Sequence, residues 1–230
     1  MKTYLIIGAS SGIGKTLAEK LSNQGHKVIA TYFEHKTENQ ENLDYHHFDV
    51  KDSGQIDFLP ETLDGLVYCP GSINLKPFGR LQAEDYLNDY QLQVVGFVNI
   101  LNKALPALKK SKSGSILTFS TVAVQSGFPF HAQVSATKGA LEGLTRALAA
   151  ELAPNIRVNA IAPSITDTPL ASKLLNSDQK KEANAERHPL KRIGSADDIA
   201  SMAAFLLSDE ATWITGQIHH IDGGISSIKN

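Results

Sequence analysis

The sequence predicts an α/β protein built around a parallel β-sheet with helices on both faces. Two observations carry this prediction: strand-like apolar runs alternate with helix-like segments along the whole chain, and a glycine-rich turn follows the first of those runs. A chain of 230 residues can bury one substantial core. Since no internal repeat or low-complexity linker interrupts the sequence, we expect residues 1–230 to form a single domain.

Short runs of apolar and β-branched residues indicate the strands. We expect strands at Tyr4–Ile7, Lys27–Tyr32, Tyr45–Phe48, Gly65–Cys69, Ser115–Ser120, Arg157–Ile161 and Gln217–Ile221. Segments with apolar residues three or four positions apart indicate the helices. We expect helices near Ile13–Asn23, Ala83–Lys110, Ala136–Leu152 and Ala196–Leu207. Because the stretch between Asp49 and Gly65 has little room for a full covering helix, that crossover is expected to be trimmed.

The composition is that of an ordinary globular protein, with 42% hydrophobic and 20% charged residues. A net charge of −2 provides no field for holding nucleic acid or an anionic membrane, and no apolar run approaches the ~20 residues of a membrane span. The single Cys69 excludes an internal disulfide and fits a reducing compartment. We therefore expect a cytoplasmic protein that binds neither nucleic acid nor membranes.

The paired histidines His46-His47 and His219-His220 invite a metal site. Neighbours on a strand point to opposite faces, so such a pair cannot easily hold one ion. No metal site is expected.

A glycine-rich loop follows the first expected strand and opens the first helix. Glycines permit a tight turn and a close approach of the backbone to a pyrophosphate, while the helix N-terminus supplies N–H groups and a favourable dipole. The plainer alternative is an ordinary strand-to-helix turn; the position directly after a strand favours nucleotide binding. The residues expected to bind are Gly8, Ser10, Ser11, Gly12, Ile13 and Gly14.

Further motifs follow this loop in order: Phe48-Asp49-Val50, Val134-Ser135-Ala136-Thr137-Lys138, Arg157-Val158-Asn159-Ala160-Ile161-Ala162-Pro163 and Asp222-Gly223-Gly224. With the loop, they resemble the short-chain dehydrogenase/reductase family from about Tyr4 to Gly224, and within it members of the 3-oxoacyl-carrier-protein reductase kind. The resemblance implies a Rossmann-type, doubly wound sheet of about seven strands and a homo-oligomer, a tetramer or dimer, that uses the long helices.

The resemblance also implies NAD(P)(H) as the cofactor and a set of residues that bind it beyond the loop. Asp49 would bond the adenine amine, Lys138 the nicotinamide ribose and Thr168 the carboxamide. The full implied set is Asp49, Val50, Gly71, Lys138, Pro163 and Thr168.

The choice between NAD(H) and NADP(H) depends on the end of the second expected strand. A carboxylate there suits the ribose 2′-hydroxyl of NAD(H), and a basic residue suits the 2′-phosphate of NADP(H). Thr31-Tyr32-Phe33 provides neither group. Nearby Lys15, His35 and Lys36 favour NADP(H) slightly, whereas Glu34 favours NAD(H).

The family's catalytic positions are altered in this chain. By motif, the serine position holds Thr121, the asparagine position holds Gln93, and the lysine is retained as Lys138. The position of the proton-donating tyrosine holds Val134, which has no titratable proton. Around the same expected pocket, Ser164 replaces the family's glycine after Pro163. Together these changes indicate drift or a changed task.

A substitute acid is available in His131, which lies seven residues, about two helical turns, before Lys138. That spacing resembles the Tyr-x6-Lys arrangement of enoyl reductases, and histidine is a common general acid. The alternative is a loop residue at the pocket rim, next to Phe128, Pro129 and Phe130.

Two functions therefore stay open. One is an NAD(P)(H)-dependent oxidoreductase that acts on a carbonyl, an alcohol or an activated double bond of a small molecule, with impaired or altered catalysis. The other is a non-catalytic NAD(P)-binding protein, a sensor or a partner subunit. In either case we expect residues 169–190 to form a lid over the substrate.

Overall fold

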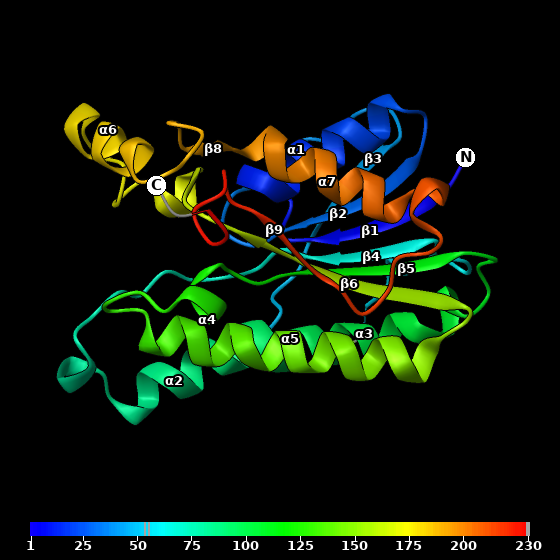
Figure 1. Cartoon of the computed structure of the whole chain (residues 1–230). Helices are drawn as coiled ribbons and strands as arrows, with labels where there is room; N and C mark the ends of the chain where they lie inside the picture. The colour runs from blue at the N-terminus through cyan, green and yellow to red at the C-terminus, as the bar shows by residue number, and fades with distance from the viewer. Residues whose placement is uncertain (53, 55, 229–230) are drawn as a thin grey trace.

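The computed structural model describes residues 1–52, 54 and 56–228. Its centre is a seven-stranded parallel sheet in the order β3-β2-β1-β4-β5-β6-β9 (Figure 1). The strands are β1 (Thr3–Ile7), β2 (Lys27–Tyr32), β3 (Leu43–His47), β4 (Gly65–Tyr68), β5 (Gly114–Phe119), β6 (Ile156–Pro163) and β9 (Ile218–Ile221). The predicted doubly wound α/β fold is confirmed, and each strand bound lies within two residues of its expected place.

Helices cover both faces of the sheet. α1 (Gly12–Asn23) and α7 (Ala196–Leu207) pack on one face, and α3 (Gly96–Leu108) and α5 (Ala132–Leu152) on the other (Figure 1). Because successive strand residues point to opposite faces, the strands feed two separate hydrophobic clusters. In β1, Leu5 and Ile7 join the cluster beneath α3, whereas Tyr4 and Ile6 face α1 and α7.

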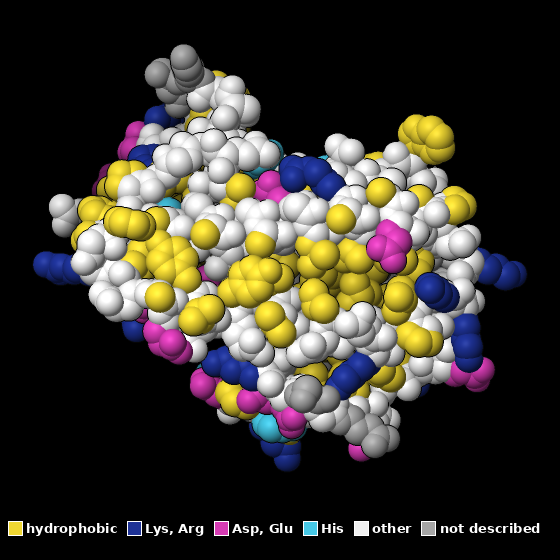
Figure 2. All heavy atoms as spheres, turned by 90° about the horizontal axis from the view of Figure 1, so that it is seen from below, with side chains coloured by type: hydrophobic (Ala, Val, Ile, Leu, Met, Phe, Trp, Pro, Cys, Tyr) yellow, Lys and Arg dark blue, Asp and Glu magenta, His cyan; other side chains and the backbone are white. Residues whose placement is uncertain are grey.

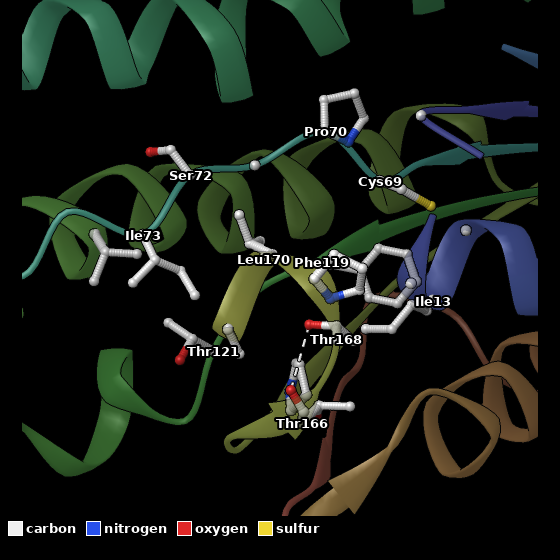
Figure 3. A pocket seen from close by; sticks show the side chains of 18 of the residues that line it. Ile13, Cys69, Pro70, Ser72, Ile73, Phe119, Thr121, Thr166, Thr168 and Leu170 are labelled. Atoms are coloured by element: carbon white, nitrogen blue, oxygen red, sulfur yellow. Dashed lines mark hydrogen bonds between the residues drawn. The ribbon is translucent and has the colours of Figure 1, made fainter. Parts of the chain in front are cut away.

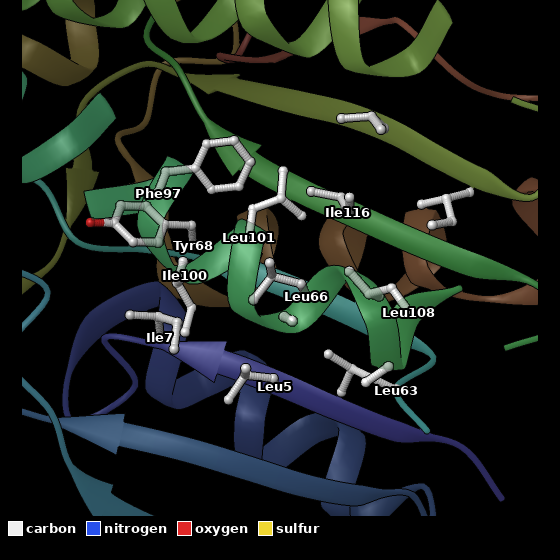
Figure 4. Packing of buried hydrophobic residues seen from close by; sticks show 14 of the residues in the cluster. Leu5, Ile7, Leu63, Leu66, Tyr68, Phe97, Ile100, Leu101, Leu108 and Ile116 are labelled. Atoms are coloured by element: carbon white, nitrogen blue, oxygen red, sulfur yellow. The ribbon is translucent and has the colours of Figure 1, made fainter. Parts of the chain in front are cut away.

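The central strands are apolar throughout because both of their faces are covered. Every residue of β4 and of β5 is buried. Figure 4 shows how Phe97, Ile100 and Leu101 of α3 pack onto Leu66 and Ile116 of these strands.

The single regular helix expected near Ala83–Lys110 is instead interrupted. It consists of α2 (Ala83–Tyr90), a π-helical turn η2 (Gln91–Val95) and then α3. A π-turn inserts an extra residue into the helical ladder and rotates the side chains beyond it. Gly96 begins α3 beneath Tyr68, whose hydroxyl oxygen lies 2.4 Å from where a β-carbon would be, so only glycine fits there.

The helix expected from Ala136 begins earlier, at Ala132. A turn with Gly127 and Phe130 at positive φ ends just before it, and the Ser135 N–H then donates to the His131 carbonyl at 2.9 Å, which closes the first helical turn. Val134 therefore lies on the helix and not in a loop.

Smaller elements were not expected from the sequence. They are α4 (Ala123–Ser126), α6 (Asp178–Glu186), the short 3₁₀ helices η1 (Phe78–Arg80), η3 (Pro169–Ala171) and η4 (Asp209–Ala211), and a two-stranded sheet of β7 (Thr166–Asp167) and β8 (Gly194–Ser195). The β7–β8 pair brackets residues 169–190, and α6 lies beyond one end of the main sheet (Figure 1). Between β3 and β4, the described residues form turns and bends without a helix.

The strand order reverses between β1 and β4, since β2 and β3 extend to one side and β5, β6 and β9 to the other. In open parallel sheets, ligands bind in the crevice beyond the carboxyl ends of the strands at this reversal. Among the described residues, none of the helices combines the length and the apolar character that a membrane crossing requires.

Candidate active site

A cavity of about 890 Å³ opens beyond the carboxyl ends of the central strands. Figure 3 shows its wall, with Ile13 of α1, Cys69 and Pro70 after β4, Thr121 after β5, and Leu170 of the 169–190 segment. The sequence-predicted residues that line it are Gly8, Ser10, Ser11, Gly12, Ile13, Gly14, Asp49, Val50, Gly71, Thr121, His131, Val134, Lys138, Pro163 and Thr168. Gln93 is the exception, because it is fully buried behind Gly71.

The glycine-rich loop forms a cradle that side chains would fill. Gly8 and Gly12 have φ of +78° and +54°, a region that L-residues rarely adopt. A β-carbon on Gly14 would lie 2.4 Å from the Gly8 carbonyl oxygen, so the first turn of α1 packs directly on the loop backbone. The Ser11 side chain does not cap α1. A pyrophosphate therefore fits this cradle in both shape and polarity, on the N–H groups of the helix N-terminus.

The end of β2 lines the same cavity with groups of both signs. Glu34 and His35 are in the wall, and Lys51, from the segment after β3, lines it too. Lys15 instead lies 3.8 Å from Glu19 on α1, and neither it nor Lys36 lines the cavity.

Val134 and Lys138 lie four residues apart on α5 and so share one helix face. Each is only 8% exposed, and both line the cavity. The Lys138 ammonium donates a hydrogen bond to the Phe119 carbonyl at 2.7 Å. Burial lowers the pKa of Lys138 to about 8, although the carboxylate of Asp89 acts in the opposite direction. Burial thus disfavours the charged form of Lys138.

Thr121 follows β5 and is half-buried in the cavity wall. Its hydroxyl oxygen accepts a bond from the Ala123 N–H at 3.3 Å. The hydroxyl proton stays available, so Thr121 can donate to a substrate oxygen.

Gln93 belongs to a buried polar group that sequence reasoning did not find. Its amide nitrogen donates to Asp89 at 2.7 Å, and Ser72 donates to the same carboxylate oxygen. The other Asp89 oxygen and the Gln93 carbonyl oxygen are buried without a protein partner among the described residues. Buried acceptors of this kind commonly bind ordered water. The spacing of four between Asp89 and Gln93 on a helix is a signal that could have found the pair.

His131 is the residue that precedes α5 and is half-buried at the cavity edge. Its Nδ1 lies 2.7 Å from the Pro129 carbonyl oxygen. Since a carbonyl only accepts, Nδ1 is the donor in this bond, and in the neutral ring Nε2 is left as the acceptor.

Neither Cys69 nor Tyr68, near the glycine-rich loop, is placed to act as a nucleophile or an acid. Burial raises the pKa of Cys69 to about 12, with Lys138 opposing the change, so this residue stays a thiol at neutral pH. The Tyr68 hydroxyl donates to the Leu92 carbonyl and is therefore occupied. Among the described residues, no group of three or more His, Cys, Asp and Glu side chains is placed to hold a metal ion.

One further pair in the cavity wall was missed. Ser164, after β6, and His188, after α6, are hydrogen-bonded at 2.8 Å although they lie 24 positions apart. The sequence signal was the serine at the family's glycine position; nothing in the sequence pointed to its partner.

Comparisons with known proteins agree with this architecture. The family described as enoyl-(acyl carrier protein) reductase matches residues 8–226. The 3-oxoacyl-(acyl-carrier-protein) reductase of Thermotoga maritima is 33% identical over 243 residues, which cover 97% of each chain. A tropinone reductase homologue of Arabidopsis thaliana is 34% identical over 241 residues, covering 96% of this chain and 92% of that protein.

Solved structures give the same result. Ligand-free aldohexose dehydrogenase of Thermoplasma acidophilum has a TM-score of 0.90 at 28% identity and covers 100% of this chain and 96% of its own. ElxO with NADP bound has a TM-score of 0.89 at 29% identity, covering 99% and 100%. The chain belongs to the short-chain dehydrogenase/reductase family, and within it resembles the 3-oxoacyl-(acyl-carrier-protein) reductases.

Proposed function

We propose that this protein is an NAD(P)(H)-dependent oxidoreductase acting on a carbonyl, an alcohol or an activated double bond of a small molecule. The observation that supports it most is the joint placement of the glycine cradle and the buried ammonium of Lys138 on one cavity. A bound nicotinamide coenzyme supplies or accepts the hydride in such chemistry. The chain's own residues hold the coenzyme, orient the substrate and manage the proton.

The binding roles follow the cavity wall. The N-terminus of α1 would hold the pyrophosphate, and Asp49 with Val50 the adenine. Lys138 would bind the nicotinamide ribose, and Thr168 beside Pro163 the carboxamide. Gly71 keeps this space open, because a β-carbon there would approach the Gln93 carbonyl oxygen at 3.3 Å and the Lys138 ammonium at 3.7 Å.

The site lacks the residue that donates the proton in the family. Thr121 would polarise the substrate oxygen. Because Val134 stands at the position of the family's tyrosine, the proton must come from another group, for which His131 and water are the candidates that the sequence offers. General acid catalysis typically contributes about 10² to 10⁴ in rate, or roughly 3–5 kcal/mol of barrier. We therefore propose a slow or altered reductase and not a disabled one.

NADP(H) is our preferred coenzyme by a small margin. His35 and Lys51 line the cavity near the end of β2 and suit a 2′-phosphate, whereas Glu34 in the same wall suits a free hydroxyl. ElxO, which is similar over nearly the whole chain, has been solved with NADP.

A non-catalytic NAD(P)-binding protein, a sensor or partner subunit, is the second candidate. It is favoured by Val134 itself, an aliphatic side chain only 8% exposed, in a cavity wall that keeps the glycine cradle and Lys138. A pocket that binds coenzyme without passing a proton would keep this arrangement.

We further propose that the protein is a cytoplasmic homo-oligomer, a tetramer or dimer. Figure 2 shows apolar side chains gathered on the face that carries α2, α3 and α5. Leu87 and Tyr90 of α2 are 62% and 45% exposed, and apolar patches of this kind commonly mark protein interfaces. Residues 169–190, which are held at their base by β7 and β8, would form the substrate lid.

Thermal-shift titration with NADH, NADPH, NAD⁺ and NADP⁺ tests the binding part of the proposal. We expect a rise in melting temperature with at least one reduced form, because a ligand that binds only the folded state stabilises it. A panel of carbonyl, alcohol and enoyl compounds, followed by nicotinamide absorbance, tests turnover. Binding without turnover would favour the second candidate, and absence of binding would contradict both.

A further inference from the structure

Ser164 and His188 form an ordered proton-transfer pair in the cavity wall. The Ser164 hydroxyl lies 2.8 Å from His188 Nε2, and His188 Nδ1 lies 2.7 Å from the Asn184 carbonyl oxygen. Because a carbonyl can only accept, Nδ1 carries a proton, and in the neutral ring Nε2 must accept from the serine. A hydroxyl bonded to an imidazole whose other nitrogen is fixed is the arrangement that activates hydroxyls in enzymes.

Both residues are held in place by the fold. The Ser164 N–H donates to the Ile221 carbonyl of β9 at 3.4 Å, which continues the pairing of β6 with β9. His188 is only 2% exposed. Its ring packs on Gly223, where a β-carbon would lie 3.5 Å from it. Packing and backbone hydrogen bonds therefore fix both partners, and the ring meets solvent only through the cavity.

The pair also opens on the cavity already described. Ser164, His188 and Asn184 all line it, together with Val134, Lys138 and Thr121. In contrast, His131 is half-buried at the start of α5. Ser164 directly follows Pro163, one of the residues proposed to flank the nicotinamide.

Resting on the proposed oxidoreductase function, we propose that Ser164 is the catalytic proton donor and acceptor of this site and that His188, acting through it, is a positioning and relay residue. The pair would take over the task that the absent tyrosine performs in the family.

The proton balance is simple. In reduction, a bound reduced nicotinamide would supply a hydride to the substrate carbon, and the carbonyl π electrons would move to oxygen. That oxygen takes the proton of the Ser164 hydroxyl, while the hydroxyl oxygen takes the Nε2 proton of a protonated His188. The imidazole is left neutral and regains its proton from solvent. In oxidation each proton moves in the opposite direction, from the substrate alcohol through Ser164 to neutral His188.

The direction of catalysis should therefore depend on pH, because the ring must carry a second proton for reduction and must lack it for oxidation. Reduction requires the protonated ring and weakens as pH rises; oxidation requires the neutral ring and weakens as pH falls. Charged side chains on the elements around the ring include Asp222, Asp198, Arg192, Arg187, Glu186, Lys191 and Lys180. Glu186 pairs with Lys191 at 3.3 Å and Asp198 with Arg192 at 2.6 Å, so these charges largely cancel each other.

Three variants separate proton transfer from mere packing. Ser164→Ala removes the hydroxyl. His188→Asn can keep a bond to the Asn184 carbonyl but has no Nε2, and His188→Gln offers Ser164 an amide partner that does not titrate. Ser172→Ala and His47→Asn are matched controls, because both residues are exposed and lie outside the cavity wall.

The experiment measures coenzyme affinity by nicotinamide fluorescence and hydride transfer by rapid mixing from pH 5.5 to 9. We expect unchanged affinity in all variants and a fall in rate of about 10²-fold for Ser164→Ala and for His188→Gln. The double variant should fall no further, because the two residues act as a unit. The pH dependence of wild type should be absent in His188→Gln.

A second readout needs no turnover. In ring-¹⁵N NMR of the coenzyme-free protein, the His188 signals, assigned by their loss in His188→Asn, should show the Nδ1–H tautomer. The Ser164→Ala spectrum should change at Nε2 only.

The outcomes are distinguishable. If coenzyme binds and turnover persists but Ser164→Ala is as fast as wild type, or if His188→Gln retains rate and pH profile, this inference is overturned while the proposed function stands. An Nε2–H tautomer would also overturn it. If coenzyme does not bind, or binds without any turnover, the oxidoreductase proposal fails and this inference fails with it.

Discussion

The two rims of the cavity differ in what carries their chemistry. On the rim formed by the glycine-rich loop, which we call the coenzyme rim, the backbone makes the binding surface. There, positive-φ glycines precede a helix N-terminus that packs on the loop at contact distance. On the opposite rim, which we call the substrate rim, side chains do so. These side chains come from α5 and from the ends of β5 and β6, and they are Thr121, Val134, Lys138 and Ser164. A backbone cradle fails as a unit when one glycine changes, whereas a side chain can be exchanged singly without loss of fold. We propose that this difference lets the family's motifs persist on one rim and depart on the other.

The largest effect is expected from Gly14→Ala. The new β-carbon would lie 2.4 Å from the Gly8 carbonyl oxygen, so α1 or the loop must move. We expect coenzyme affinity to fall at least about 100-fold by calorimetry, since each 1.4 kcal/mol of misfit is a factor of ten. Gly79→Ala is the control, because nothing lies within 4 Å of its β-carbon position. Equal affinity in the two variants would show that the cradle is not the binding site.

Val134→Tyr should produce the next largest change. A phenol one turn before Lys138 would restore the family's acid, and we expect hydride transfer to rise by about 10² or more. Val134→Phe is the matched control, since it adds the ring without the hydroxyl. A rise in both variants would mean that packing, and not a proton, was limiting.

Lys138→Met isolates the cost of the buried ammonium. Burial lowers the pKa of Lys138 from its usual 10.5 to about 8 in the folded chain, so between those values Lys138 binds fewer protons in the folded than in the unfolded chain. The unfolding free energy of wild type should therefore rise with pH from about 8 to 10.5, relative to the variant, by roughly 1–3 kcal/mol. Denaturant titrations across this range, with exposed Lys109→Met as control, measure it. A wild-type stability that fell relative to Lys138→Met would contradict the assigned burial cost.

His131→Ala should have the smallest effect. This residue is half-buried and precedes α5, whereas His188 of the proposed pair is only 2% exposed. We expect hydride transfer to change by less than about threefold, far below the 10² to 10⁴ of a general acid. Complete loss of turnover would instead identify His131 as the relocated acid.

The sequence predicted the parts of this molecule that depend on local pattern. All seven strands, α1 and α7 follow from apolar runs and spacing, and the glycine cradle follows from a motif whose physics is local. The π-turn at Gln91–Val95 and the early start of α5 were missed because tertiary contacts set them: Gly96 against Tyr68, and the turn at Gly127 and Phe130.

Within the candidate site, long-range pairs were the hard part. Asp89 with Gln93 was readable as a helical spacing, but Ser164 with His188 joins the end of a strand to a segment 24 residues later. Only the path of the 169–190 segment, closed by β7 and β8, brings those two side chains together.

The most direct test of the account is to titrate wild type and Val134→Tyr with NADPH and NADH while following nicotinamide fluorescence, and then to add substrate to the same samples. We predict equal coenzyme affinity in the two proteins and faster hydride transfer in Val134→Tyr than in wild type. The reason is that the coenzyme rim binds the coenzyme, whereas the substrate rim transfers the proton. Failure of both proteins to bind either coenzyme would contradict the account.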